Sequence, residues 1–141
     1  MNNENSTRLR SVKESDCLFL YELLKERDPR VNISHKKMPS FAQHVKFVLS
    51  KPYTKWYVII EDKKDVGSVY LTKNNEIGIF IKKNIQGKGI GFKALKLLME
   101  KNPRNKYLAN VSPKNKKSIL FFKNNRFSLI QYTYELQNTS R

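Results

Sequence analysis

The residues with the clearest chemical potential lie in the short segment QGKGIG, Gln86 to Gly91, between an alternating apolar stretch and an amphipathic one. Glycine lets a backbone turn tightly and lets a ligand approach its amides. A helix that begins here would direct its unpaired N–H groups and positive dipole end into the turn, where Lys88 adds a charge. The segment predicts a site for a phosphate or pyrophosphate, with a plain strand-to-helix connection as the alternative.

Two common phosphate-binding motifs do not fit this segment. The dinucleotide fingerprint needs a glycine where Phe92 stands. The phosphate loop of nucleoside triphosphatases needs glycine at Lys82 and serine or threonine at Gly89. A phosphate-containing ligand that is bound through a different motif must therefore be considered.

Glu76 and two histidines could take part in proton transfer or ligand binding. Glu76 opens an alternating stretch, so its side chain should share one face with Gly78 and Phe80, opposite the neighbouring isoleucines. His35 lies in an expected loop and titrates near neutrality, so it could act as a base or bind a phosphate. His44 lies on an expected helix. For Glu76 the alternative is a solvent-facing residue at a strand end, and for His44 an exposed helical residue.

The elements that must position these side chains follow from the apolar periodicity. Strands are predicted over residues 7–12, 55–61, 66–72, 76–82, 106–112 and 126–136, the last as one or two strands. Helices are predicted from Asp16 or Ser15 to before Pro29, over 41–49 with Ser40 as cap, over 89–101, and after Pro113. This order predicts an α/β (α+β) protein with a mixed sheet and helices on its faces.

The length and composition limit the function classes. A chain of 141 residues predicts one domain over 1–141, with 1–6 as a disordered end. The net charge of +16 favours polyanionic ligands, unless it only reflects a biased base composition of the gene. Cys17 is the single cysteine and cannot form an internal disulfide, which fits a cytoplasmic protein. No secretory signal or membrane helix is expected, and no metal site.

The segment QGKGIG is similar to the Gln/Arg-x-x-Gly-x-Gly/Ala signature of the GCN5-related N-acetyltransferase (GNAT) superfamily, with Gln86, Gly89 and Gly91 at the signature positions. The later stretch NVSPKNKKSILFFKNNRF resembles the family's next motif, through the matching residues Asn115, Ser118, Phe121, Phe122 and Phe127. The element order agrees over nearly the whole chain. The resemblance implies a GNAT fold, whose mixed sheet of six to seven strands is flanked by about four helices and has its fourth and fifth strands splayed.

The resemblance also implies a binding site for acetyl-CoA. The turn amides would hold its pyrophosphate, at Gln86, Gly87, Lys88, Gly89, Ile90 and Gly91. The backbone of the preceding strand would pair with pantetheine at Phe80 and Ile81, and the amide of Ile79 or Ile81 would polarise the thioester carbonyl. Asn115 would contact the pantetheine arm with Ser118 nearby, and Phe122 stands where relatives often carry a tyrosine that acts as general acid.

The same resemblance assigns candidate catalytic and acceptor residues. Some relatives use a carboxylate at the position of Glu76 as general base, often through water. Asn110 occupies the place where relatives that modify ribosomal proteins carry a catalytic glutamate. The loop of His35 shapes the acceptor site in the family, and a helical histidine like His44 recurs in relatives that acetylate amino-sugar nucleotides. Arg126 departs from the family's usual glycine.

The sequence therefore predicts an acetyl-CoA-dependent N-acetyltransferase that moves an acetyl group to a primary amine by direct attack. The expected acceptor is an amino-sugar nucleotide, with a ribosomal-protein N-terminus as the alternative. A rival class is a catalytically silent GNAT-fold module associated with nucleic acid, suggested by the charge and by Phe122. A silent module would not need the pyrophosphate site that the glycine turn predicts. Nucleic acid is therefore not the expected partner. A homodimer is one assembly that the chain could form.

Overall fold

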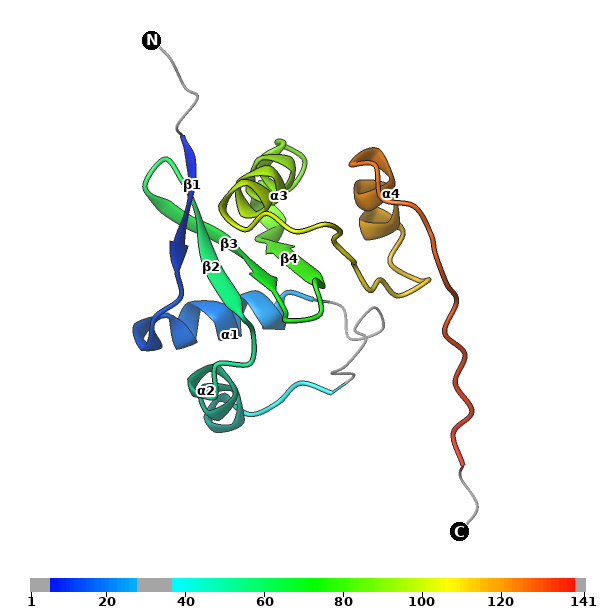
Figure 1. Cartoon of the computed structure of the whole chain (residues 1–141). Coiled ribbons are helices and arrows are strands. Elements are labelled where there is room, and N and C mark those ends of the chain that lie inside the picture. Colours follow the sequence, from blue (N-terminus) through cyan, green and yellow to red (C-terminus); the bar gives the residue numbers. More distant parts are fainter. Residues whose placement is uncertain (1–5, 28–36, 139–141) are drawn as a thin grey trace.

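The computed structural model describes residues 6–27 and 37–138. These ranges contain four strands in one antiparallel sheet of order β1-β2-β3-β4, with helices on both faces (Figure 1). The strands are β1 (Thr7–Ser11), β2 (Lys55–Glu61), β3 (Lys64–Leu71) and β4 (Ile77–Ile81). The helices are α1 (Cys17–Lys25), α2 (Phe41–Leu49), α3 (Ile90–Lys101) and α4 (Lys116–Asn124), with 3-10 turns η1 (Glu14–Asp16) and η3 (Lys83–Ile85). The predicted four helices and first four strands are confirmed.

Two apolar clusters hold the helices to the sheet. On one face, Ala94, Leu95 and Leu98 of α3 are almost fully buried against apolar side chains of all four strands. On the other face, Cys17 and Leu20 of α1 pack with Val48 of α2. Cys17 is therefore a small residue of the core. No described helix is long and apolar enough to cross a membrane.

Side-chain caps set the starts of two helices. Ser40 and Gln43 form a reciprocal capping box at α2, since the Ser40 hydroxyl accepts from Gln43 N–H at 3.1 Å and Gln43 Oε1 accepts from Ser40 N–H at 2.9 Å. Asn115 Oδ1 accepts from Ser118 N–H at 3.1 Å at the start of α4. The serine cap is as predicted, whereas α4 begins later than Pro113 suggests.

Asp16 does more than precede α1. It is almost fully buried, and its carboxylate accepts two hydrogen bonds of 2.9 Å from the Arg10 guanidinium and one of 2.7 Å from Lys13 N–H. Burial disfavours the charged carboxylate, but the hydrogen bonds from Arg10 and Lys13 outweigh this and hold the pKa of Asp16 below its ordinary value. The pair ties β1 to the start of α1.

We expect Asp16→Asn to lower the free energy of unfolding by about 2 kcal/mol at neutral pH, because charged hydrogen bonds to Arg10 are lost. The folded-state pKa lies below the unfolded value of about 3.9, so this contribution is present above that value and disappears as the pH falls through the folded-state pKa. Urea unfolding of both proteins at neutral and acid pH measures this. An equal difference at both pH values would contradict the role of the charge.

The prediction of six to seven strands is wrong for the described residues. The segment 106–112 makes only one isolated parallel bridge, between Glu76 and Leu108. The Tyr107 hydroxyl donates to Asn102 O at 2.6 Å and accepts from Arg104 N–H at 3.0 Å, so the chain is tied back to the end of α3 instead of continuing along β4.

The predicted final strands at 126–136 are also absent from the structure. After α4 the chain runs in an extended course away from the sheet (Figure 1). Its apolar side chains beyond Phe127 are exposed, with Leu129 at 70% and Ile130 at 73%. Among the described residues, this segment pairs with no strand of the sheet.

Candidate functional site

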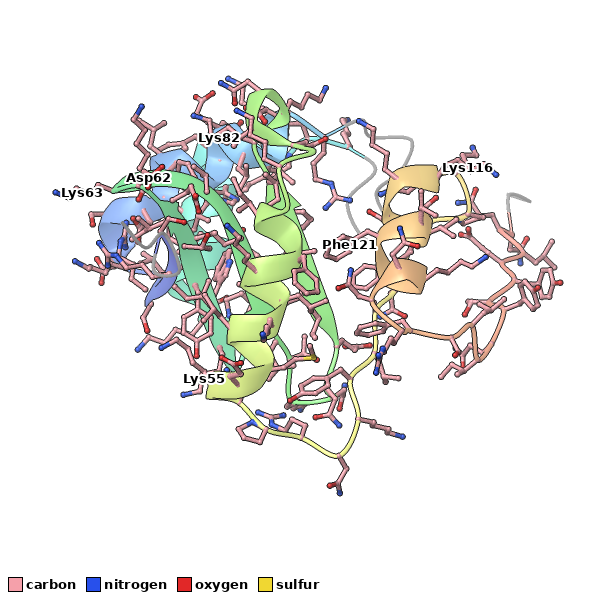
Figure 2. All side chains as sticks on the ribbon, turned by 90° about the horizontal axis from the view of Figure 1, so that it is seen from above. Lys55, Asp62, Lys63, Lys82, Lys116 and Phe121 are labelled. Carbon is pink, nitrogen blue, oxygen red and sulfur yellow. The ribbon has the colours of Figure 1, made fainter. Side chains whose placement is uncertain are left out.

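The glycine turn between β4 and α3 leaves its backbone open. Gly87 and Gly89 have φ values of 86° and 79°, in the left-handed region that glycine adopts without strain. A Cβ placed on either residue would meet no atom within 4 Å. Gly91 serves packing instead, since a Cβ there would approach the Phe121 ring at 3.1 Å, and Figure 2 shows Phe121 on the side of α4 toward α3.

The N-terminus of α3 is uncapped and points into this turn. Gly89 is the N-cap residue, and it makes no side-chain cap. The first helical bond runs from Lys93 N–H to Gly89 O at 3.2 Å, so the amides of residues 89–92 have no acceptor within the helix. Lys88 is exposed beside them. Free amides, a helix dipole and a lysine together form an anion site.

Gln86 fixes the turn to its neighbours on both sides. Its Nε2 donates to Ile81 O at 3.0 Å, at the end of β4. Its Oε1 accepts from Lys117 Nζ of α4 at 3.4 Å. The side chain therefore positions the anion site relative to β4 and brings a second lysine toward it.

The outer edge of β4 presents backbone groups next to the turn. In an antiparallel pair, alternate residues bond to the neighbouring strand and the others point their N–H and C=O groups away from it. Glu76 O accepts from Thr72 N–H at 2.9 Å, so the even-numbered residues bond toward β3. The N–H and C=O groups of Ile77, Ile79 and Ile81 consequently face the outer edge.

Some of these outward-facing backbone groups form hydrogen bonds, whereas two of the N–H groups do not. Ile77 N–H donates to Leu108 O at 2.7 Å, and Ile81 O accepts from Gln86. In the described part of the chain, the N–H groups of Ile79 and Ile81 have no hydrogen-bond acceptor. Segment 106–112 leaves β4 after the bridge at Leu108, so this edge stays uncovered by a strand.

Glu76 is held at the start of this edge by two side chains. It is half-buried, and its Oε1 accepts from the Thr72 hydroxyl at 3.1 Å. Its Oε2 accepts from Asn110 Nδ2 at 3.0 Å. The structure thus brings together two candidates that are far apart in sequence. The carboxylate is oriented by neutral donors and could receive a proton.

An aromatic face follows Glu76 along β4. Tyr70 lies directly opposite Gly78, and a Cβ on Gly78 would overlap the Tyr70 ring. Tyr53 stacks on Tyr70 with centroids 3.7 Å apart and planes 1° apart. The Phe80 centroid lies 6.2 Å from that of Tyr70, and Arg27 Cζ lies 4.2 Å from the Phe80 centroid. Burial raises the pKa of both tyrosines, so their hydroxyls stay protonated at neutral pH.

The two histidines differ in what the structure says of them. His35 lies outside the described residues. His44 is only 5% exposed on α2, and its ring centroid lies 5.3 Å from that of Tyr21 and 6.4 Å from that of Phe47. His44 is therefore part of the aromatic packing beneath α2, and the alternative of an exposed helical histidine is wrong.

The second motif positions α4 beside α3. Asn115 and Ser118 meet in the helix cap, and Phe122 is 8% exposed with its ring centroid 5.0 Å from that of Phe127. Arg126 has φ 73° and takes the left-handed position after α4 that usually belongs to glycine. The helix still ends with the bond from Phe127 N–H to Phe122 O at 2.9 Å, so the departure at Arg126 leaves its exit intact.

Sequence reasoning missed Thr72, Tyr53, Tyr70 and Arg27. Gly78 within an alternating strand was a usable signal, since such a glycine often marks the close approach of another group. The other contacts depend on how strands and helices pair, which local patterns do not encode. Among the described residues, no group of three or more His, Cys, Asp or Glu side chains could hold a metal ion.

Comparison with known families gives one match. The profile of the acetyltransferase (GNAT) family matches residues 17–127, which include β2 to β4, the glycine turn, α3 and α4. A search of the curated proteins finds no match.

Solved structures share the fold at low sequence identity. A domain from Methanocaldococcus jannaschii is 21% identical, with a TM-score of 0.78 over 92% of each chain. The ribosomal-protein acetyltransferase RimL, solved with coenzyme A, is 20% identical, with a TM-score of 0.73 over 92% of this chain and 84% of its own. The spermidine/spermine N-acetyltransferase SpeG from Vibrio cholerae is 20% identical, with a TM-score of 0.67 over 86% of this chain and 78% of its own.

Proposed function

The chain belongs to the acetyltransferase (GNAT) family of acetyl-CoA-dependent enzymes, and from this premise we propose which of its residues carry out N-acetyl transfer to a primary amine. The observation that carries the proposal is the presence of two sets of unpaired backbone amides, those of Ile79 and Ile81 at the outer edge of β4 and those of residues 89–92 at the uncapped start of α3. Glu76 lies beside the first set and Lys88 beside the second.

The glycine turn fits the pyrophosphate of acetyl-CoA. Gly87 and Gly89 leave open space above the backbone, and the amides of residues 89–92 can each donate to a phosphate oxygen. Lys88 adds a positive charge there, and Lys117 is held near the turn by its hydrogen bond to Gln86. Asn115 is committed to the cap of α4, so its contribution to cofactor binding would be to hold the helix in place.

The edge of β4 fits the remaining needs of the chemistry. Acetyl-CoA supplies a thioester whose acetyl group passes to the amine. The outward N–H of Ile79 would donate to the carbonyl oxygen as negative charge develops on it, with Ile81 as the neighbouring donor. The amine must lose a proton to form the amide, and Glu76 is the proposed acceptor of that proton, directly or through a water.

A dedicated general acid is not required. A thiol has a pKa of about 8.5, so a thiolate can leave with little help. Phe122 cannot donate a proton and lies in the packing between α4 and Phe127. Tyr132 and Tyr134 also carry hydroxyls that could donate a proton, but they are 73% and 89% exposed on the segment after α4. On the face of Glu76, the hydroxyl of Tyr70 stays protonated at neutral pH.

We propose an amino-sugar nucleotide as the first acceptor class to test. The net charge of +16 favours a diphosphate, and Asn110 replaces the glutamate found in relatives that modify ribosomal proteins. The likeness of His44 to the helical histidine of relatives that acetylate amino-sugar nucleotides is a weaker argument, because His44 is buried and would act only through its neighbours. A protein N-terminus is the second candidate, since RimL shares the fold and is a ribosomal-protein acetyltransferase.

Thiol release from acetyl-CoA, with mass spectrometry of the acceptor, tests the proposal against amino-sugar nucleotides, basic and acidic peptides and polyamines. Turnover with an amino-sugar nucleotide is the expected result. Turnover with peptides alone would replace the acceptor class and leave the chemistry standing. Tight acetyl-CoA binding without turnover on any amine, together with salt-sensitive nucleic-acid binding, would overturn the proposed activity.

A further inference from the structure

Arg27 is a charged residue on the face of Glu76 that the proposed chemistry does not use. It follows α1, and its guanidinium lies over the Phe80 ring, with Cζ 4.2 Å from the ring centroid. Among the described residues, no carboxylate lies within ion-pair distance of it and its side chain donates no hydrogen bond. An arginine carries five N–H donors, so this one has donors to spare.

The position of Arg27 is fixed by its neighbour in sequence. Glu26 Oε1 accepts from Lys83 N–H at 2.8 Å, which ties the end of α1 to the turn after β4. That bond places Arg27 over Phe80 instead of leaving it at a free helix end. Because β4 is held in turn by β3, the guanidinium has a defined place relative to the outward amide of Ile79 and to Glu76.

The surroundings of Arg27 make an anionic ligand favourable. Tyr53, Tyr70 and Phe80 form an aromatic wall on this face, and burial against it lowers the pKa of Arg27 from its ordinary value. A guanidinium that has lost water and gained no counter-ion gains more from an anion than an exposed lysine does. Contact with Phe80 stabilises the cation only modestly.

We propose that Arg27 is an acceptor-binding residue, which takes a carboxylate or phosphate group of the amine substrate while Glu76 takes the amine proton. This inference rests on the proposed function and narrows it to acceptors that carry an anionic group. Alternating residues of a strand are about 7 Å apart, so Glu76 and Phe80 are separated by about 13 Å along β4. An acceptor that serves both must be longer than a simple amino acid, and a polyamine would be repelled at Arg27.

The test compares Arg27→Gln with wild type on matched acceptor pairs. One arm uses a nucleotide-linked amino sugar and the same sugar without its nucleotide, and the other uses peptides with an acidic or a neutral residue after the N-terminus. Arg8→Gln on β1, at the opposite edge of the sheet, is the control for the loss of one charge. The arm in which the anionic member is preferred identifies phosphate or carboxylate as the ligand.

We expect Arg27→Gln to raise KM for the preferred anionic acceptor about 10- to 100-fold, with little effect on its uncharged counterpart or on the Kd for acetyl-CoA. Arg8→Gln should change neither value. Equal effects of the two substitutions, or no preference for anionic acceptors in wild type, would overturn the inference.

A binding measurement separates this inference from the proposed activity. Calorimetry with UDP and with an acidic dipeptide reports on the Arg27 site whether or not any amine is acetylated. Binding of one probe to wild type that Arg27→Gln weakens and Arg8→Gln leaves unchanged would support the site even if turnover were absent. Failure of wild type to bind either probe would contradict it.

Discussion

Replacing Gly89 with glutamate should raise the Kd for acetyl-CoA at least about 100-fold. Gly89 has φ 79°, which a residue with a Cβ adopts only with strain, and the open space above it would receive a negative charge. A carboxylate at the start of α3 would occupy the anion site and repel the pyrophosphate. Calorimetric titration with acetyl-CoA measures the effect.

Gly89→Asn is the matched control, because asparagine tolerates the left-handed region and adds no charge. We expect it to retain most of the affinity that Gly89→Glu loses. Thermal unfolding of both variants must show that each is folded. An unchanged Kd in folded Gly89→Glu would refute the assignment of this turn to the pyrophosphate.

The second large effect is expected at Glu76. Glu76→Gln should lower kcat about 100-fold, since general bases contribute on that order, while the Kd for acetyl-CoA stays near the wild-type value. The substitution keeps the shape of the side chain and its place between Thr72 and Asn110 but removes its capacity to take a proton. Steady-state kinetics on the acceptor identified by the panel, with separate titration of acetyl-CoA, measures both quantities.

Glu100→Gln is the control, because Glu100 is an exposed residue near the end of α3, at the opposite end of that helix from the glycine turn. It should have wild-type kinetics. If kcat of Glu76→Gln is within about twofold of wild type, the proton goes to another group. His35, which follows α1 in the sequence, is then the next residue to replace.

In this chain, local sequence patterns predict the helices and strands better than they predict which of these elements pair with one another. The helices over 41–49 and 89–101 follow from apolar spacing and caps, and the strand over 55–61 matches β2 to the residue. The start of β3 was missed because Asp62 and Lys63 form the turn with φ values of 50° and 69°. The sequence predicts a turn over residues 62–65, but the turn takes only Asp62 and Lys63, so Lys64 and Asp65 already belong to the strand.

The missing strands have a different cause. Residues 106–112 have a strand-like composition, but the Tyr107 hydroxyl binds the end of α3 and only Leu108 pairs with β4. The competing contact spans only five residues of sequence, from Tyr107 to Asn102, but it is made by a side-chain hydroxyl that the alternation of apolar residues does not register. In residues 126–136, Phe127 packs beside Phe122, whereas Leu129, Ile130, Tyr132, Tyr134 and Leu136 remain exposed.

The candidate site also combines features that local sequence patterns predict with features that they do not. The glycine turn is predictable because left-handed φ values and an uncapped helix leave a mark in the composition of the segment. The pairing of Glu76 with Asn110, and the place of Arg27 over Phe80, arise only when distant segments meet. Chemistry carried by the backbone was therefore easier to find than chemistry carried by converging side chains.

A backbone amide NMR titration with acetyl-CoA tests most directly where the cofactor binds. We expect the largest shift changes at residues 86–91 and at the outward amides of Ile79 and Ile81, all saturating with one dissociation constant. Shift changes confined to another surface, or no change at saturating acetyl-CoA, would contradict the proposed site.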